Sequence, residues 1–195
     1  MNVKLYPADA ILPADRREIL RYARAGDAGE RENSLLTECL ADLLPHLTYR
    51  VAWAEYPVTI NGSHLNLGFT ETDSADLAKN LRDCPRIVLF AATIGFAPDR
   101  LAQKYSRISP VKALFLESIG NERIETLCDL FCAEFPGARP RFSPGYGDLS
   151  LDLQREILAS LDCPRKIGLT LNESLLLSPS KSVTAIMGVQ NHTKE

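Results

Sequence analysis

The chain has 195 residues, of which 45% are hydrophobic and 24% are charged, and its formal net charge is -3. This length and composition suit one hydrophobic core, and we expect a single globular domain over residues 1–195. Lysine and arginine are scattered, no stretch approaches the roughly 18 apolar residues of a membrane span, and the N-terminus lacks the apolar core of a signal peptide. These features argue against nucleic acid or a membrane as partner and favour a cytoplasmic protein that binds a small molecule or another protein.

Residues 1–45 are expected to form two helices. The segment PADRREILRYARA has a proline and an aspartate at helix-start positions, and DAGERENSLLTECLADLLPHL repeats apolar residues at helical spacing until Pro45.

An antiparallel hairpin is expected next. The segments YRVAWAEYPVTI and SHLNLGFTE flank Asn61-Gly62, a dipeptide that suits the positive φ angles of a tight turn.

Residues 46–189 are expected to form an α+β core. Thr72, Asp73 and Ser74 offer caps for a helix in DLAKNLRDC, and RIVLFAATIG is typical of a central strand buried on both faces. The pattern from Pro98 to Phe135 is helical again. It predicts a short helix through Tyr105 and a longer one from about Pro110, with Gly120-Asn121 as a weak point in the middle of the longer helix.

The last third of the chain opens with the loop RFSPGYGD and continues with a helix in LDLQREILASL, a strand in KIGLTL and a final strand near SVTAIMGV. Helices and strands mix rather than alternate strictly. The sequence therefore predicts an α+β fold with a mainly antiparallel sheet and flanking helices. Residues 190–195 are expected to fray.

No familiar catalytic constellation is present in the sequence. His46, His64 and His192 have no nearby serine or cysteine in a nucleophile motif, and SPSKSV lacks the glycines that let backbone amides surround a phosphate. We name no catalytic residue and no metal ligand. Any chemistry in this protein must depend on positioning rather than on an acid, a base or a protein nucleophile.

Five cysteines show no C-x-x-C spacing: Cys39, Cys84, Cys128, Cys132 and Cys163. An odd number in a cytosolic-looking chain predicts thiols, mostly buried. Cys128 and Cys132 are four apart on a predicted helix, which could place two metal ligands on one face. Further ligands are not evident, so buried thiols are the favoured interpretation.

The loop RFSPGYGD, residues 141–148, combines turn residues with polar recognition groups. Together with SADLAKNLRDCPRIVLFAATIG, the D-x-L-x-x-x-Y spacing of 99–105, KALFLESIGNERIETLCD and KIGLTLNESLLLSPSKSVTAIMGV, it resembles the activation (reactivation) domain of cobalamin-dependent methionine synthase. The resemblance is to the free-standing small proteins of that family. Its most specific part is R-x-x-x-G-Y, formed by Arg141, Gly145 and Tyr146 and followed by L-x-E-S at 171–174.

The resemblance implies that the chain binds S-adenosylmethionine and docks on a cobalamin-carrying partner, either a methionine synthase or another corrinoid protein. In that family an electron from a flavodoxin-like or other reductase restores cob(I)alamin, which S-adenosylmethionine then methylates. This methyltransferase partial reaction maintains methionine biosynthesis. The chain lacks the D-x-H-x-x-G lower-ligand motif, since His64 in GSHLNLG has no preceding aspartate, so the corrinoid is expected on another chain.

The resemblance also implies a set of S-adenosylmethionine-binding residues. Arg141 suits the methionyl carboxylate through its planar fork of donors, and Ser143, Gly145 and Tyr146 belong to the same loop. The alternative for this loop is a structural turn with a surface ion pair. Glu125 and Asp129 share one helix face, and either meet the ligand's ammonium or ribose hydroxyls or form a solvated acidic face.

Glu173 is expected either to orient the loop or to be a surface carboxylate.

Two departures from the family pattern leave a second function open. The tyrosine expected near the C-terminal strand is replaced by Met187, and an N-terminal aspartate has no clear counterpart. The alternative is therefore a non-catalytic clamp or assembly factor for a corrinoid protein that no longer binds S-adenosylmethionine.

Overall fold

The computed structural model describes residues 3–7, 13–26 and 28–190. Its centre is a four-stranded antiparallel sheet in the order β1 (Lys4–Tyr6), β2 (Arg50–Pro57), β6 (Arg86–Thr93), β9 (Ser182–Val189). The predicted central strand is confirmed, because β6 pairs along its whole length with β2 on one side and β9 on the other. The expected fraying of 191–195 falls outside the described residues.

Two small sheets accompany the main one. The first has the order β3 (Thr59–Asn61), β4 (His64–Asn66), β5 (Glu71–Asp73), and the second pairs β7 (Thr170–Leu171) with β8 (Leu177–Ser178). The predicted hairpin joins β3 to β4, but its turn is Gly62-Ser63, because Asn61 pairs with His64 as a strand residue. Only Gly62 of the predicted pair carries the positive φ, +66°. The long strand before the hairpin was assigned wrongly, since β2 pairs in the main sheet.

The helices are α1 (Arg16–Tyr22), α2 (Glu30–Leu43) with the short 3₁₀ turn η1 (Leu44–His46), α3 (Ala75–Asn80), α4 (Ala97–Tyr105), α5 (Pro110–Ala133), α6 (Leu153–Ser160) and α7 (Cys163–Ile167). The helices predicted from the sequence are confirmed, and Ser74 caps α3 as expected. Helix α5 continues unbroken through the predicted weak point at Gly120-Asn121.

The predicted strand KIGLTL is wrong in its first half. Its first two residues end α7, which has a proline in its first turn and ends at Gly168 with φ +71°. Proline at a helix start and a left-handed glycine at its end are strong helix signals, and they prevail here over the β-rich composition. Only Thr170 and Leu171 form a strand. The strand β1 was not predicted.

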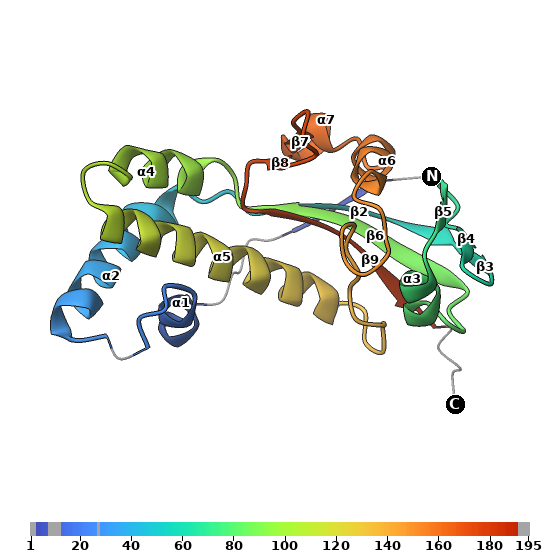
Figure 1. The fold of residues 1–195 in the computed structure, drawn as a ribbon, viewed down its shortest axis with the longest axis horizontal. Helices are drawn as coiled ribbons and strands as arrows, with labels where there is room; N and C mark the ends of the chain where they lie inside the picture. The colour runs from blue at the N-terminus through green and yellow to red at the C-terminus, as the bar shows by residue number, and fades with distance from the viewer. Residues whose placement is uncertain (1–2, 8–12, 27, 191–195) are drawn as a thin grey trace.

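Helices cover both faces of the main sheet (Figure 1). Successive side chains of β6 point to opposite faces of the sheet, and since they are apolar, both faces must be buried. Val88 and Phe90 point to one side, where they pack with Phe131 and other apolar residues from the C-terminal half of α5. Ile87 and Leu89 point to the other side, where α3, α6 and α7 cover them. The N-terminal half of α5 extends past the sheet and forms a third cluster with α1, α2 and α4. One long helix thus links the N-terminal helices to the sheet.

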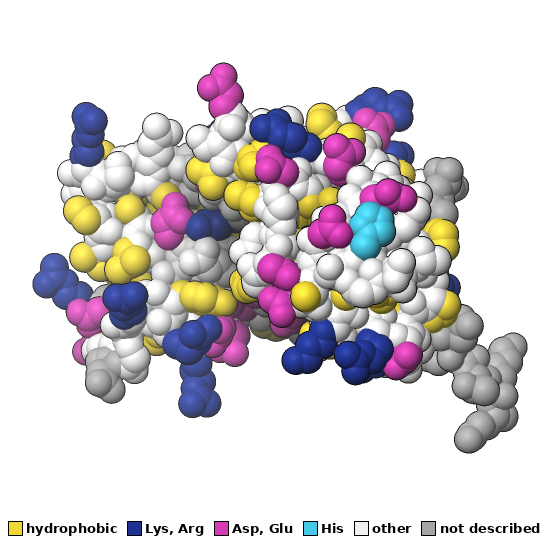
Figure 2. Space-filling view, turned by 45° about the vertical axis from the view of Figure 1, so that its right-hand side comes forward, with side chains coloured by type: hydrophobic (Ala, Val, Ile, Leu, Met, Phe, Trp, Pro, Cys, Tyr) yellow, Lys and Arg dark blue, Asp and Glu magenta, His cyan; other side chains and the backbone are white. Residues whose placement is uncertain are grey.

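Acidic and basic side chains are interspersed over the face drawn in Figure 2, with hydrophobic side chains between them. Within the described residues, no helix combines the length and apolar character needed to cross a membrane.

Candidate ligand pocket beside Arg141

A pocket of about 440 Å³ lies between α5, α6, β8 and the beginning of β9, and the loop 141–146 forms one of its walls. Its lining combines charged, polar and apolar groups, which is typical of a site for a polar small molecule. The lining residues are Glu125, Arg141, Phe142, Ser143, Pro144, Tyr146, Gln154, Leu177, Ser182, Val183 and Thr184.

Backbone hydrogen bonds attach the loop to β9, the edge strand of the main sheet. Phe142 N donates to Ile186 O at 2.8 Å, and Ile186 N donates to Phe142 O at 2.9 Å. This bridge does not continue to the next pair, because Pro144 would face Thr184 and a proline has no N–H to donate. The loop therefore turns away from β9 at this point, and the pocket opens beside the strand.

The loop turn depends on two glycines. Gly145 has φ +88° and Gly147 has φ +53°, angles that other residues rarely adopt. The loop ends at Asp148, whose carboxylate accepts hydrogen bonds from Ala75 N at 2.7 Å, from Asp76 N at 3.2 Å and from the hydroxyl of Ser74. The loop is thus attached to β9 at one end and to the N-terminus of α3 at the other.

The free edge of β9 points backbone groups toward the pocket. Residues two apart in an antiparallel strand direct their N–H and C=O groups to the same side. Since Ile186 bonds outward to Phe142, Thr184 directs its N–H and C=O away from β6 as well. Thr184 lines the pocket, so the pocket wall offers one backbone donor beside one backbone acceptor.

Arg141 lies between two carboxylates of α5. Its Nη1 donates to Asp129 Oδ1 at 2.8 Å, and its Nη2 pairs with Glu125. The Arg141 side chain is 25% exposed, whereas that of Asp129 is 74% exposed. Burial alone would lower the pKa of Arg141, but the neighbouring Cys128, Glu125 and Asp129 more than offset it, and the pKa is raised. The guanidinium is a fixed positive charge at the pocket wall.

The three residues Arg141, Glu125 and Asp129 were all predicted as site residues, and the structure brings them together. The ion pair itself is the feature that the alternative interpretation of the loop predicted, although that interpretation did not name Glu125 and Asp129 as its partners. Of the three, Arg141 and Glu125 line the pocket and Asp129 does not.

The other predicted site residues divide into two groups. Ser143 and Tyr146 line the pocket, and Tyr146 is 69% exposed at its rim. Gly145 lies in the turn and does not line it. Glu173 is an exposed residue of the tight turn between β7 and β8 and also lies outside the lining.

Sequence reasoning missed the pocket residues of α6, β8 and β9. Gln154 is a buried polar residue on the apolar face of α6, and its Nε2 donates a hydrogen bond to Leu175 O at 3.1 Å. A polar residue at a core position of this predicted helix is the sequence signal that could have pointed to Gln154. Met187, the residue at which the sequence resemblance implied a tyrosine, is buried in the cluster between the sheet and α5 and is not one of the pocket-lining residues.

No family model matches the chain, and no curated protein matches it. Among solved structures, the chain is similar to the MetH reactivation domain bound to AdoHcy, with a TM-score of 0.70, 15% sequence identity and coverage of 100% of this chain and 80% of that one. The chain has the fold of the MetH reactivation domain. This confirms the fold that the sequence resemblance implied, including the α+β class with antiparallel strands and flanking helices.

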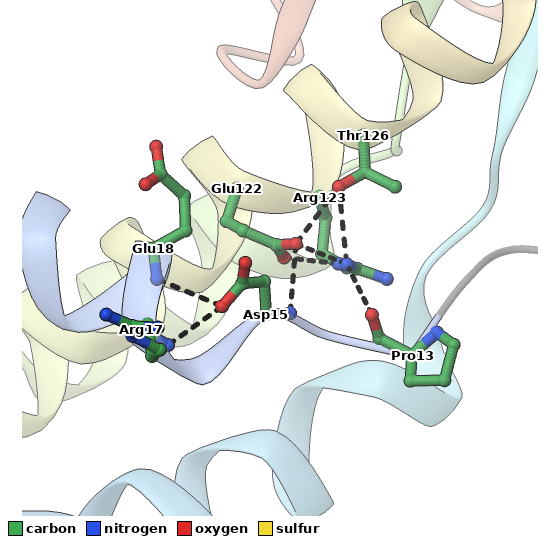
Figure 3. Close-up of polar contacts among 7 residues, drawn as sticks. All are labelled: Pro13, Asp15, Arg17, Glu18, Glu122, Arg123 and Thr126. Atoms are coloured by element: carbon green, nitrogen blue, oxygen red, sulfur yellow. Dashed lines mark hydrogen bonds and ion pairs between the residues drawn. The ribbon is translucent and has the colours of Figure 1, made fainter.

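Within this MetH reactivation-type fold, α5 also carries a buried ion pair between Glu122 and Arg123, about one helical turn before Glu125; Figure 3 shows the polar contacts of this pair. Glu122 and Arg123 are 3% and 2% exposed, and Arg123 Nε donates to Glu122 Oε2 at 2.5 Å. Glu122 also accepts hydrogen bonds from Asp15 N at 3.2 Å and from the hydroxyl of Thr126 at 3.0 Å. Because Asp15 caps α1, this cluster attaches the start of α1 to the helix that carries Glu125.

The cysteines are free, and four of the five are buried, which confirms the interpretation as mostly buried thiols. Burial raises the pKa of Cys163 to about 12 and that of Cys39 to about 11, so both remain protonated at neutral pH. Burial also raises the pKa values of Cys128 and Cys132. Among the described residues, no three His, Cys, Asp or Glu side chains are grouped so that they could hold a metal ion.

Proposed function

We propose that this protein binds S-adenosylmethionine in the pocket beside Arg141 and presents it to a cobalamin-carrying partner for reductive reactivation. The partner is a cobalamin-dependent methionine synthase or a related corrinoid methyltransferase. The observation that carries the proposal is a fold shared with a domain that was crystallised with AdoHcy, the demethylated form of the proposed ligand, together with a pocket lined by the R-x-x-x-G-Y loop.

Arg141 is suited to the carboxylate of the ligand's amino-acid end. A guanidinium can hold a carboxylate by two parallel hydrogen bonds, which a lysine ammonium cannot reproduce. Glu125 and Asp129 hold the guanidinium in place before the ligand arrives. Glu125 lines the pocket beside Arg141 and can accept from the ligand's ammonium group once the carboxylate binds.

The wall formed by β9 is suited to the adenine end of the ligand. Adenine presents a ring-nitrogen acceptor next to an exocyclic amino donor, and the outward N–H and C=O of Thr184 form the matching pair. Phe142, Leu177 and Val183 supply apolar surface for the ring. The pocket volume of about 440 Å³ falls in the usual range for a ligand of this size.

The proposed reaction needs no acid or base from this chain. The sulfonium methyl group is electrophilic, and it passes to a nucleophile while the electron pair of the broken C–S bond stays on the sulfur of AdoHcy. Such a displacement needs alignment and exclusion of water, which a binding site supplies. In this proposal the cobalt nucleophile is bound to the partner chain and the electron comes from a flavodoxin-like or other reductase. The exposed Tyr146 at the pocket rim contacts the partner.

A second candidate function is a clamp or assembly factor for a corrinoid protein that has lost ligand binding. One observation favours it, namely that two carboxylates of the protein already occupy the guanidinium of Arg141. Calorimetric titration with S-adenosylmethionine and with AdoHcy distinguishes the two. Saturable heat supports the proposed function, and no heat at millimolar ligand supports the clamp.

A further inference from the structure

We infer that Lys181 is a positioning residue for the pocket. Its side chain fills a notch on α5 at Gly120, and through this contact it sets the place of the Ser182–Thr184 wall relative to Glu125. The inference rests on the proposed function for the identity of the ligand. It also explains three sequence features that the proposed function leaves without a role, which are the SPSKSV segment, Gly120-Asn121 and Asp99.

The Lys181 side chain lies across the backbone of α5. It is 12% exposed, its Nζ donates to Asn121 Oδ1 at 2.9 Å, and it forms an ion pair with Glu117. A Cβ atom added at Gly120 would lie 3.0 Å from Lys181 Cγ, 3.1 Å from Cε and 3.2 Å from Cδ. Glycine is unfavourable in a helix interior, so its presence here has a packing reason. An alanine methyl group at this position would be in tight contact with the lysine stem, which would have to move by a few tenths of an ångström.

The residues around Lys181 are fixed at further points. Asp99, near the start of α4, accepts a hydrogen bond from Ser180 N at 2.9 Å and another from the Ser180 hydroxyl. Lys181 O accepts from Ile94 N at 3.2 Å, just beyond the end of β6. Residues 180 and 181 are thus held by α4, by α5 and by the main sheet.

The position of this contact explains why the pocket depends on it. Ser182, Val183 and Thr184 follow Lys181 directly and line the pocket, and Thr184 is within about 10 Å of Lys181 along an extended chain. Glu125 lies five residues after Gly120 on the same helix, or about 7.5 Å along its axis. The lysine therefore joins α5 and β9, two elements that both contribute residues to the pocket lining, although it does not line the pocket itself.

The test uses the variants Gly120→Ala, Lys181→Ala and the double variant, with Lys112→Ala as a matched control. Lys112 is also a buried lysine of this fold, and it pairs with Glu38 and Asp42 of α2 far from the pocket. The readouts are the Kd for S-adenosylmethionine by calorimetry, the melting temperature, and amide hydrogen exchange of residues 181–185 without ligand.

Each single variant at the notch should weaken binding about tenfold, and Gly120→Ala should have little further effect in the Lys181→Ala background, because the two share one contact. The melting temperature of Gly120→Ala should stay nearly constant, since alanine favours the helix while its methyl group displaces the lysine. Lys112→Ala should lower the melting temperature and leave the Kd unchanged. The inference is overturned if Lys181→Ala behaves like Lys112→Ala.

Hydrogen exchange separates this inference from the proposed function. If the wild-type protein binds no S-adenosylmethionine, the proposed function fails, but faster exchange of 181–185 in Lys181→Ala and not in Lys112→Ala would still support the positioning role. Unchanged exchange in both variants would reject that role.

Discussion

Arg141 Nη1 lies 2.8 Å from Asp129 Oδ1, while the Nη2 of the same guanidinium pairs with Glu125 one helical turn away. The two carboxylates come from one face of α5, and the arginine comes from the loop that bridges to β9. This pairing positions the positive charge before a ligand arrives. It also means that a ligand carboxylate must share the guanidinium with protein carboxylates.

Glu125 and Asp129 should differ in their effect on binding. Glu125→Gln should weaken S-adenosylmethionine binding, because Glu125 lines the pocket and its charge complements the ligand's ammonium. Asp129→Asn should change the affinity less than about threefold, because Asp129 is 74% exposed and lies outside the pocket lining. Calorimetry on both variants measures this. Equal losses would show that the acids act only through Arg141.

Asp148 should contribute to stability against acid. The Ser74 hydroxyl and the backbone N–H groups of Ala75 and Asp76 bond to its carboxylate and lower its pKa below the ordinary value of 3.8. The unfolded chain therefore binds the proton at a higher pH than the folded chain does. The contribution is complete above about pH 4 and is lost as the pH falls through the folded-state pKa.

Asp148→Asn should accordingly lower the melting temperature at pH 7 and make the decline toward acid pH less steep. Thermal melts from pH 7 to pH 3 measure both effects. Asp152→Asn, at the residue directly before α6, is the control, because Asp152 is exposed and its ion pair with Arg155 spans 4.0 Å. A parallel decline in Asp148→Asn and wild type would show that the cap at α3 does not contribute.

The buried pair of Glu122 and Arg123 should be costly to break. Glu122→Gln leaves a buried guanidinium without its carboxylate, and we expect the free energy of unfolding to fall by about 3 kcal/mol. Urea denaturation measures the change. The double variant Glu122→Gln, Arg123→Met should lose less than the sum of the single variants, and Arg165→Met, at an exposed ion pair, should have almost no effect. A negligible loss in Glu122→Gln would mean that the remaining partners of Arg123 compensate.

Much of the fold was predictable because local signals agree with tertiary packing. The cap at Ser74, the apolar run of β6 and the helical spacing of α5 each specify one structure. The errors arise where local signals compete. Ile167 is β-branched and is followed by the apolar and β-branched residues 169–171, yet a proline start and Gly168 favour helix.

The candidate site was predictable only in part. The loop 141–148 is recognisable from its own residues, and Glu125 and Asp129 from their helical spacing. The walls from β8 and β9 depend on which strand forms the sheet edge and on where Pro144 ends the bridge to it. No local pattern encodes that arrangement, so Thr184 could be found only in the folded structure, whereas Gln154 left one signal in the sequence, a polar residue at a core position of α6.

The most direct test of the central claim is calorimetric titration of wild type, Arg141→Lys and the control Arg165→Lys with S-adenosylmethionine. We expect saturable binding by the wild type and the control. We expect a tenfold to hundredfold weaker Kd for Arg141→Lys, or about 1.5 to 3 kcal/mol, because an ammonium cannot make the two-point planar contact. The melting temperature without ligand should hardly change in either variant. A large fall in the melting temperature of Arg141→Lys with an unchanged Kd, or no binding by the wild type at millimolar ligand, would contradict the claim that this loop is a ligand site.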